Sequence, residues 1–197
     1  MMADSLEPRT RLRTIVVFSM LFAILAATAI FAYFATFSRP VTTVILVRHA
    51  EKNIDPNNSD PDLSPAGQAR AQELARMFGN AGINAIYATT YKRTQQTVKP
   101  LANRTGVAVN IIDAKQTSEL VKQILTTNRG QTVFVAGHNN TVPEAIEALG
   151  GEHLPVIPES EFDNMFILTI YRFGKAKLVK FKYGAASPTV GSGTMTP

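Results

Sequence analysis

The sequence contains no cysteine and only three histidines, and charged residues make up 18% of its 197 residues. Without cysteine, the chain has no disulfide scaffold, no thiolate zinc site and no cysteine nucleophile. Three histidines are too few for a histidine-rich metal cluster. A hydrophobic fraction of 45% excludes a disordered acidic protein and a collagen-like chain. The length leaves room for one ordinary domain.

Charge is also missing from segment 15–37, whose 23 residues are almost all apolar. As a helix, this segment would be about 35 Å long, enough to cross a hydrocarbon core of about 30 Å. Uniform apolarity over such a length is not typical of a core helix in a soluble protein. The sequence therefore predicts one N-terminal transmembrane helix that makes the membrane a partner of this chain.

Three arginines precede the apolar segment, namely Arg9, Arg11 and Arg13. They predict that residues 1–14 stay in the cytoplasm and that the rest of this single-pass protein lies outside it, in a periplasmic or extracellular space. A cleaved signal peptide is the alternative, because residues 27–29 (ATA) fit a small-residue cleavage site. Cleavage there would leave an exposed apolar N-terminus, which favours the anchor.

Residues 40–197 carry only a mild basic excess, 16 Lys and Arg against 13 Asp and Glu. The densest basic patch alternates with apolar residues around Lys177 and Lys180, as on the solvated face of a strand. A nucleic-acid site needs tighter clustering and aromatic residues on the same face. Nucleic acid is therefore not an expected partner.

Hydrophobic patterning predicts alternating strands and helices in residues 40–183. The expected strands are 41–47, 85–88, 107–112 and 132–136, with a terminal hairpin of 166–171 and 177–183. The expected helices begin at Ser64-Pro65 and cover 92–105 (interrupted or kinked near Pro100), 118–127 and 142–149. This alternation predicts an α/β fold, a three-layer αβα sandwich with a mostly parallel central sheet. Residues 184–197, rich in Gly, Ser, Thr and Pro, are expected to be a disordered tail.

Ligands of open parallel sheets bind beyond the carboxyl ends of the strands. Arg48 and His49 follow the first predicted strand. Arg93 lies near the start of the helix after the second strand, and His138 follows the fourth. We therefore expect two histidines and two arginines to meet at one rim of the sheet.

This set of side chains suits phosphoryl transfer. Two guanidinium groups near helix N-termini can bind a dianionic phosphoryl group. A neutral imidazole can attack phosphorus, and a second, protonated imidazole, from His138, can stabilise the developing charge. A metal site is the alternative, but the arginines would repel a cation. The expected chemistry is hydrolysis through a phosphohistidine, with no metal and no other cofactor.

Four blocks of sequence, in order, are similar to motifs of the histidine phosphatase superfamily, the phosphoglycerate-mutase-like proteins. They are residues 46–52 (LVRHAEK), 62–70 (DLSPAGQAR), 89–97 (TTYKRTQQT) and 137–143 (GHNNTVP). The opening RHAEK resembles a short bacterial-type branch of the superfamily. The resemblance runs from about residue 42 to about residue 172, and it implies a histidine phosphatase domain over residues 40–183 with phosphatase activity.

Carried over by motif position, the resemblance implies His49 as the phosphorylated nucleophile. Arg48, Arg93 and His138 would complete the phosphate pocket, and Asn139 is a further candidate for substrate binding. The expected substrate is a phosphomonoester or related phosphoryl compound, either a small molecule or an envelope component.

The acid that protonates the leaving group is less clear. The mutase branch has a glutamate-bearing insert between the second arginine and the second histidine, and residues 97–132 are too short for it. The acid-phosphatase branch has an aspartate where this chain has Asn139. Glu51 is the first candidate, with a structural ion pair to Lys52 or Arg93 as its alternative, and Asp163 is the second.

Two other functions stay open at this point. The missing acid allows a non-catalytic phosphoryl-binding or scaffold module, and the absence of a visible cap domain allows a protein-phosphohistidine phosphatase in signalling. Asn139 begins an Asn-x-Thr sequon, and a glycan there would cover the proposed pocket. A bacterial-type envelope is therefore the expected location. The sequence does not predict the substrate or the oligomeric state.

Overall fold

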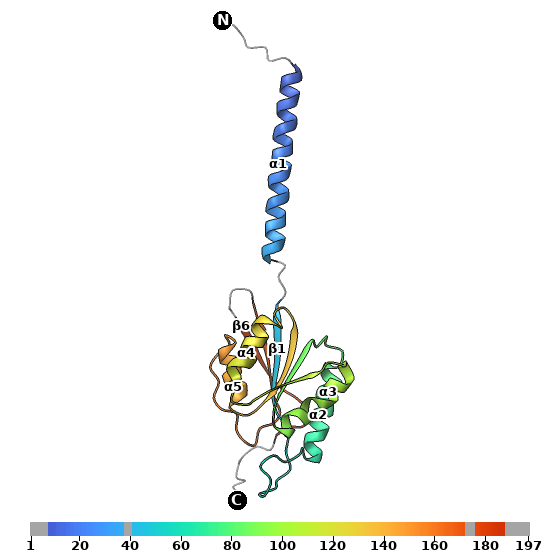
Figure 1. Ribbon diagram of the computed structural model, residues 1–197, viewed down its shortest axis with the longest axis vertical. Coiled ribbons are helices and arrows are strands. Elements are labelled where there is room, and N and C mark those ends of the chain that lie inside the picture. Colours follow the sequence, from blue (N-terminus) through green and yellow to red (C-terminus); the bar gives the residue numbers. More distant parts are fainter. Residues whose placement is uncertain (1–7, 38–40, 172–175, 188–197) are drawn as a thin grey trace, which may run out of the picture. The chain divides into compact units, whose positions relative to one another are not determined.

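The computed structural model of the protein describes residues 8–37, 41–171 and 176–187 (Figure 1). The chain divides into two units, residues 1–39 and residues 40–197. The described part of the first unit is a single helix, and the second unit is an α/β domain.

The helix of the first unit, α1, runs from Pro8 to Phe37. Its segment Arg11–Phe34 has 24 residues and a mean hydropathy of 2.6. At 1.5 Å per residue this segment is about 36 Å long, more than the hydrocarbon core of a bilayer. Large apolar side chains such as Phe22 and Phe31 are exposed on it. The helix is long and apolar enough to cross a membrane, although a signal sequence has the same properties.

The domain is built on a six-stranded sheet with the order β3-β2-β4-β1-β5-β6. The strands are β1 (Thr42–Arg48), β2 (Ala85–Thr89), β3 (Val109–Ile112), β4 (Thr132–Gly137), β5 (Asn164–Ile170) and β6 (Ala176–Lys182). All pairs among the first four strands, namely β1 with β4, β2 with β4 and β2 with β3, are parallel. Strand β5 pairs antiparallel with both β1 and β6. The two central strands, β4 and β1, are buried on both faces, which explains their continuous apolar runs.

Four helices cover the two faces of the sheet, namely α2 (Pro65–Phe78), α3 (Lys92–Thr105), α4 (Thr117–Thr126) and α5 (Thr141–Ala148). Leu74 of α2 and Leu101 of α3 share one core with Ile45 of β1. Ile146 of α5 shares the other core with the next strand residue, Leu46, on the face that α4 also covers. Helices α2 and α3 therefore lie on one face, and α4 and α5 on the other (Figure 1). The predicted three-layer αβα sandwich is confirmed.

The elements predicted for residues 40–183 are all present, with boundaries that differ by at most two residues, whereas α1 begins seven residues before the predicted apolar segment 15–37. Strand β3 begins at Val109 rather than at residue 107, and β5 begins at Asn164 rather than at residue 166. Helix α3 runs through Pro100 without the predicted interruption. The predicted hairpin forms between β5 and β6, and its turn at Gly174-Lys175 lies outside the described residues.

The first residues of the predicted tail, 184–187, belong to the fold. Arg70 donates a hydrogen bond from Nη2 to the carbonyl oxygen of Ala185, at 2.8 Å. The hydroxyl of Ser187 donates to Oδ1 of Asp163, at 2.8 Å, and accepts from the amide of Phe162. The composition of residues 184–187 is typical of a tail. It does not reveal these contacts, because residues 184–187 contribute only a backbone carbonyl and one hydroxyl to them. Residues 188–197 lie outside the described residues.

The start of α2 lies against the segment that follows the first histidine. The Ser64 hydroxyl caps the helix by accepting from the amide of Gly67 at 3.2 Å, and the Ser64 amide donates to the carbonyl oxygen of Glu51 at 2.9 Å. A Cβ atom added to Gly67 would lie 2.1 Å from that same carbonyl oxygen. Only glycine allows α2 to approach so closely, and this approach positions Glu51, two residues after His49.

Substituting Gly67→Ala should therefore destabilise the domain. A glycine-to-alanine change inside a helix normally stabilises by about 1 kcal/mol, whereas a buried steric clash costs about 1–3 kcal/mol. Because the clash is with a backbone oxygen, its cost should lie at the upper end of that range, and we expect urea unfolding to show a net loss of about 1–2 kcal/mol. Gln72→Ala, at an exposed position of the same helix, is the control and should change stability by less than about 0.5 kcal/mol. A Gly67→Ala protein as stable as the parent would contradict the close approach.

Candidate active site

Three neighbouring strands, β2, β4 and β1, end at the same rim of the sheet. Arg48 at the end of β1 is paired with Gly137 at the end of β4. His49 and His138 follow directly, and the amide of His49 donates to the carbonyl oxygen of Gly137 at 2.9 Å. Arg93 reaches the rim from the first turn of α3, and its Nη2 lies 3.5 Å from Nδ1 of His138. The structure thus brings together the four residues expected at one rim.

The two histidine rings are buried side by side, with centroids 5.5 Å apart. Nδ1 of His49 lies 2.8 Å from the carbonyl oxygen of Ala50. Because a carbonyl can only accept, Nδ1 carries the hydrogen and Nε2 keeps its lone pair. On the second ring, Nε2 of His138 lies 3.0 Å from the hydroxyl of Thr89. His49 is therefore oriented with Nε2 available as a nucleophile.

Burial and nearby positive charge keep both histidines neutral. Burial lowers the pKa of His49 to about 3, and the Arg48 and Arg93 guanidinium groups act in the same direction, although the hydrogen bond to Ala50 opposes them. Burial, followed by Arg93 and Arg48, lowers the pKa of His138 to about 4. These neighbours disfavour a second cation on His138. A protonated His138 is expected beside a bound phosphoryl group, and that expectation stays a prediction.

The two arginines carry hydrogen-bond donors without acceptors. Four buried side-chain polar atoms lack a partner among the described residues, and three of them are Nε of Arg48, Nε of Arg93 and Nη1 of Arg93. Buried donors are normally satisfied, because an unpaired one loses its hydration without compensation. An anion with several acceptor oxygens would fit these positions. A metal cation would not, since it meets donors rather than lone pairs.

Arg93 is held in place by Asp60, from the turn-rich segment before α2, and by Tyr91, which directly precedes α3. Its Nη1 lies 3.6 Å from Oδ1 of Asp60, and its Cζ lies 4.2 Å from the ring centre of Tyr91. Asp60 also accepts from the backbone amide of Lys92, at 3.1 and 3.2 Å, at the start of α3. The sequence offered no signal for Asp60 beyond its place in a polar loop.

Glu51 is bound to Arg70, a residue that the sequence analysis did not single out. Nε and Nη2 of Arg70 reach both carboxylate oxygens of Glu51 at 2.7–3.1 Å. Burial raises the pKa of Glu51, but the hydrogen bonds from Arg70 bring it below its ordinary value. The candidate role of Glu51 as proton donor conflicts with this arrangement, because the carboxylate is ionised. Arg70 takes the place of the expected partners Lys52 and Arg93, and its own burial explains why it needs a carboxylate.

The second acid candidate, Asp163, is also held in its ionised form by its hydrogen-bond partners. Burial raises its pKa, but hydrogen bonds from Lys182 and Ser187 outweigh this effect and lower it to about 2. Asn139 does reach the rim, and its Nδ2 donates to Oε1 of Glu159 at 2.6 Å. The two acid candidates from the sequence, Glu51 and Asp163, are thus bound to other side chains. Glu159, which the sequence analysis did not single out, lies next to the site.

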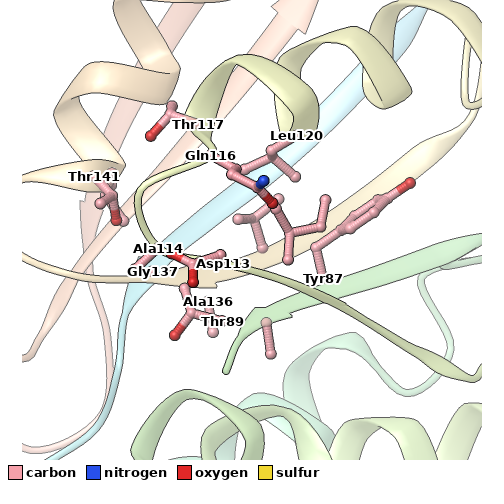
Figure 2. A pocket seen from close by; sticks show the side chains of 14 residues that line it. Tyr87, Thr89, Asp113, Ala114, Gln116, Thr117, Leu120, Ala136, Gly137 and Thr141 are labelled. Atoms are coloured by element: carbon pink, nitrogen blue, oxygen red, sulfur yellow. The ribbon is translucent and has the colours of Figure 1, made fainter. Parts of the chain in front are cut away.

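A small cavity lies beside Gly137, the residue before His138, on the side of the sheet that α4 covers (Figure 2). Thr89, Gly137 and Thr141 line it, together with Asp113 from the segment before α4. The hydroxyl of Thr141 accepts from the amide of His138 at 2.9 Å. The cavity measures about 30 Å³, which is room for about one water molecule. It is too small for a substrate, which must approach from the rim.

Comparison with known proteins agrees with this geometry. A sequence model of the histidine phosphatase superfamily (branch 1) matches residues 44–115, which contain three of the four motif blocks. No curated protein sequence matches the chain significantly.

Two solved structures illustrate the likeness of the fold. The mycobacterial glucosyl-3-phosphoglycerate phosphatase superposes with a TM-score of 0.59 at 13% identity, covering 73% of this chain and 100% of that one. The protein histidine phosphatase SixA, complexed with tungstate, gives a TM-score of 0.58 at 16% identity, covering 71% of this chain and 96% of that one. At these identities the likeness establishes the fold.

The lowered pKa values predict how stability depends on pH. Below the ordinary histidine pKa of 6.5, the unfolded chain takes up protons on His49 and His138 that the folded chain refuses. The free energy of unfolding should therefore decrease as the pH falls from 6.5 towards 4. Urea unfolding at a series of pH values measures this slope. The double substitution His49→Gln/His138→Gln should flatten it.

The exposed His153 offers the matched control, since its ring lies outside the site and contacts Glu147. His153→Gln should leave the slope as it is in the parent protein. A slope that survives the loss of both buried histidines would mean that other groups cause it.

Proposed function

We propose that this chain, which matches a sequence model of the histidine phosphatase superfamily over residues 44–115, hydrolyses a phosphoryl compound through a phosphohistidine formed on His49. The superfamily match and the fold support a hydrolase of the phosphatase type. One observation carries the proposed mechanism, namely that three guanidinium nitrogens of Arg48 and Arg93 have no hydrogen-bond partner among the described residues and lie beside two neutral imidazoles. A phosphoryl group supplies the acceptor oxygens that these donors lack.

In the first step, the lone pair on Nε2 of His49 attacks phosphorus, and the bond to the leaving oxygen breaks on the opposite side. The hydrogen bond from Nδ1 to Ala50 holds the ring in the required orientation. Water then attacks the phosphohistidine, the N–P bond breaks, and inorganic phosphate leaves. The arginines balance the charge on the equatorial oxygens, so the mechanism needs no metal ion.

His138 changes its state when the substrate binds. In the free site, Arg93 and Arg48 disfavour its protonated form. A bound dianion reverses the sign of the local field and favours protonation of the imidazole. The protonated ring can then donate to a phosphoryl oxygen, beside the donors of the two arginines. Binding of the dianion therefore creates the positive charge that the transition state requires.

Two substrate classes follow from the likeness to known folds. One structural relative is a phosphatase of glucosyl-3-phosphoglycerate and another is a protein histidine phosphatase. We propose a phosphorylated small molecule or envelope component for this chain, and a phosphohistidine peptide as the second candidate. A panel of sugar phosphates, lipid phosphates, nucleotides and phosphohistidine peptides separates the classes.

Replacing the nucleophile tests the mechanism. His49→Ala should reduce turnover of an aryl phosphate to background, because no other group can accept the phosphoryl group. The parent protein, mixed with 32P-labelled substrate and quenched in alkaline detergent, should carry acid-labile label that His49→Ala lacks.

His153→Ala is the control for this experiment, since His153 is an exposed histidine outside the site. It should keep both turnover and labelling. Phosphate binding by the parent without turnover or labelling would instead identify a non-catalytic phosphoryl-binding module. Full activity of His49→Ala would refute the assignment of the nucleophile.

We further propose that α1 anchors the protein in a membrane with the domain outside the cytoplasm. The apolar segment Arg11–Phe34 is long enough to span the bilayer, and exposed side chains cover it. The arginines at its N-terminal end favour a cytoplasmic N-terminus. A cleaved signal sequence is the alternative that shares these features.

Expression of the full chain in a bacterium tests the anchor. The protein should stay in the membrane fraction after an alkaline carbonate wash, and its mass should include residues 1–37. Externally added protease should digest the domain in spheroplasts but leave cytoplasmic markers intact. A mature protein that begins near Ile30 would show instead that the segment is a signal peptide.

A further inference from the structure

The carboxylate of Glu159 forms an ion pair with Arg48, one of the two arginines that the proposed function assigns to the phosphoryl group. Its Oε2 accepts from Nη2 of Arg48 at 2.5 Å, and its Oε1 accepts from Nδ2 of Asn139 at 2.6 Å. Arg48 is 2% exposed, whereas the side chain of Glu159 is 75% exposed. The carboxylate therefore reaches the buried site from the solvent side, where a substrate enters and a leaving group departs.

The backbone around Glu159 is fixed by the site itself. Nη1 of Arg48 donates to the carbonyl oxygens of Pro158, Glu159 and Glu161 at 2.8–3.1 Å. The ring of Phe162 lies 4.3 Å from Cζ of Arg48 and packs near His49, at 6.0 Å between ring centroids. The loop is thus held by bonds to Nη1 that a ligand need not disturb, while the carboxylate of Glu159 can move.

Other carboxylates near the arginines have permanent partners. Glu51 binds Arg70, and Asp163 binds Lys182 and Ser187. Asp60 lies 3.6 Å from Nη1 of Arg93, but two hydrogen bonds from the backbone amide at the start of α3 also hold it. Glu159 differs, because its side chain is 75% exposed and its bonds in the described part of the chain come from the side chains of Arg48 and Asn139. A phosphoryl group bound to Arg48 can therefore displace it from Nη2.

We infer that Glu159 is the acid that protonates the leaving group, a role that rests on the proposed function. When a phosphoryl dianion binds Arg48, the carboxylate loses its cationic partner and faces two negative charges. Both changes favour the protonated form of a carboxyl group. The amide of Asn139 keeps the group beside the site, although Asn139 itself has no acidic proton.

The proton balance of the reaction then closes. As the P–O bond breaks, its electron pair goes to the leaving oxygen, which takes the proton from Glu159 and departs as an alcohol. Glu159, now a carboxylate, accepts a proton from the water that attacks phosphohistidine. The N–P bond breaks, its electron pair returns to Nε2 of His49, and Glu159 is again protonated.

Leaving groups of different basicity test this role on the full chain in detergent. Glu159→Gln keeps an oxygen that can accept from Arg48 but carries no proton to transfer. We expect it to lower kcat for an alkyl phosphate by about 10²- to 10⁴-fold. With 4-nitrophenyl phosphate, whose phenolate leaves unprotonated, the first step should proceed nearly as in the parent, and 32P label should accumulate on His49.

Glu152→Gln is the matched control, because Glu152 lies in the same connecting segment and pairs with Lys180 on the surface. It should behave as the parent with both substrates. An equal loss in the rate of His49 phosphorylation with alkyl and aryl phosphates, or a gain with both, would overturn the acid role. A gain would identify Glu159 as a carboxylate that only competes with the substrate. A parent protein that hydrolyses neither substrate would instead refute the proposed function itself.

Discussion

The site depends on positive charge that is buried without enough acceptors. Arg48 lies at the end of β1 and Arg93 in the first turn of α3, and together they keep three guanidinium nitrogens free of hydrogen-bond partners among the described residues. The fold tolerates this because rings of Phe162 and Tyr91 stack on the guanidinium groups and because carboxylates at the rim offset part of the charge. An anion with several oxygens would remove the remaining cost, so the proposed ligand agrees with the electrostatics of the site.

The same charge also keeps the proposed nucleophile, His49, neutral. A histidine attacks phosphorus only when it is neutral, and burial together with the arginines lowers the pKa of His49 to about 3. The carbonyl of Ala50 then selects which nitrogen carries the hydrogen. Binding and nucleophilicity are therefore not separate properties of this site. Weakening the positive field would loosen the anion and, at the same time, allow protonation of the group that must attack it.

Much of the fold was predictable from the sequence, because its signals are local. The apolar runs of the central strands and the Ser64-Pro65 helix start need no tertiary information. His49 and His138 were predictable in position because each directly follows a strand, and parallel strands end at one rim. The partner of Glu51 was not, since Arg70 lies on a different element and its burial depends on how α2 packs. Glu159 was missed for a similar reason, as an irregular loop carries it.

The pair of Glu51 and Arg70 shows why the acid could not be Glu51 without a cost to the fold. Arg70 also donates to the carbonyl oxygens of Tyr183 and Ala185, so its charge joins α2, the segment after His49 and the end of the described domain. Protonating Glu51 would leave a buried guanidinium without its anion. A proton donor must change charge in every cycle, and that requires a carboxyl group whose cationic partner is supplied or removed by the substrate. An exposed carboxylate on a fixed loop meets this condition, whereas a buried structural ion pair does not.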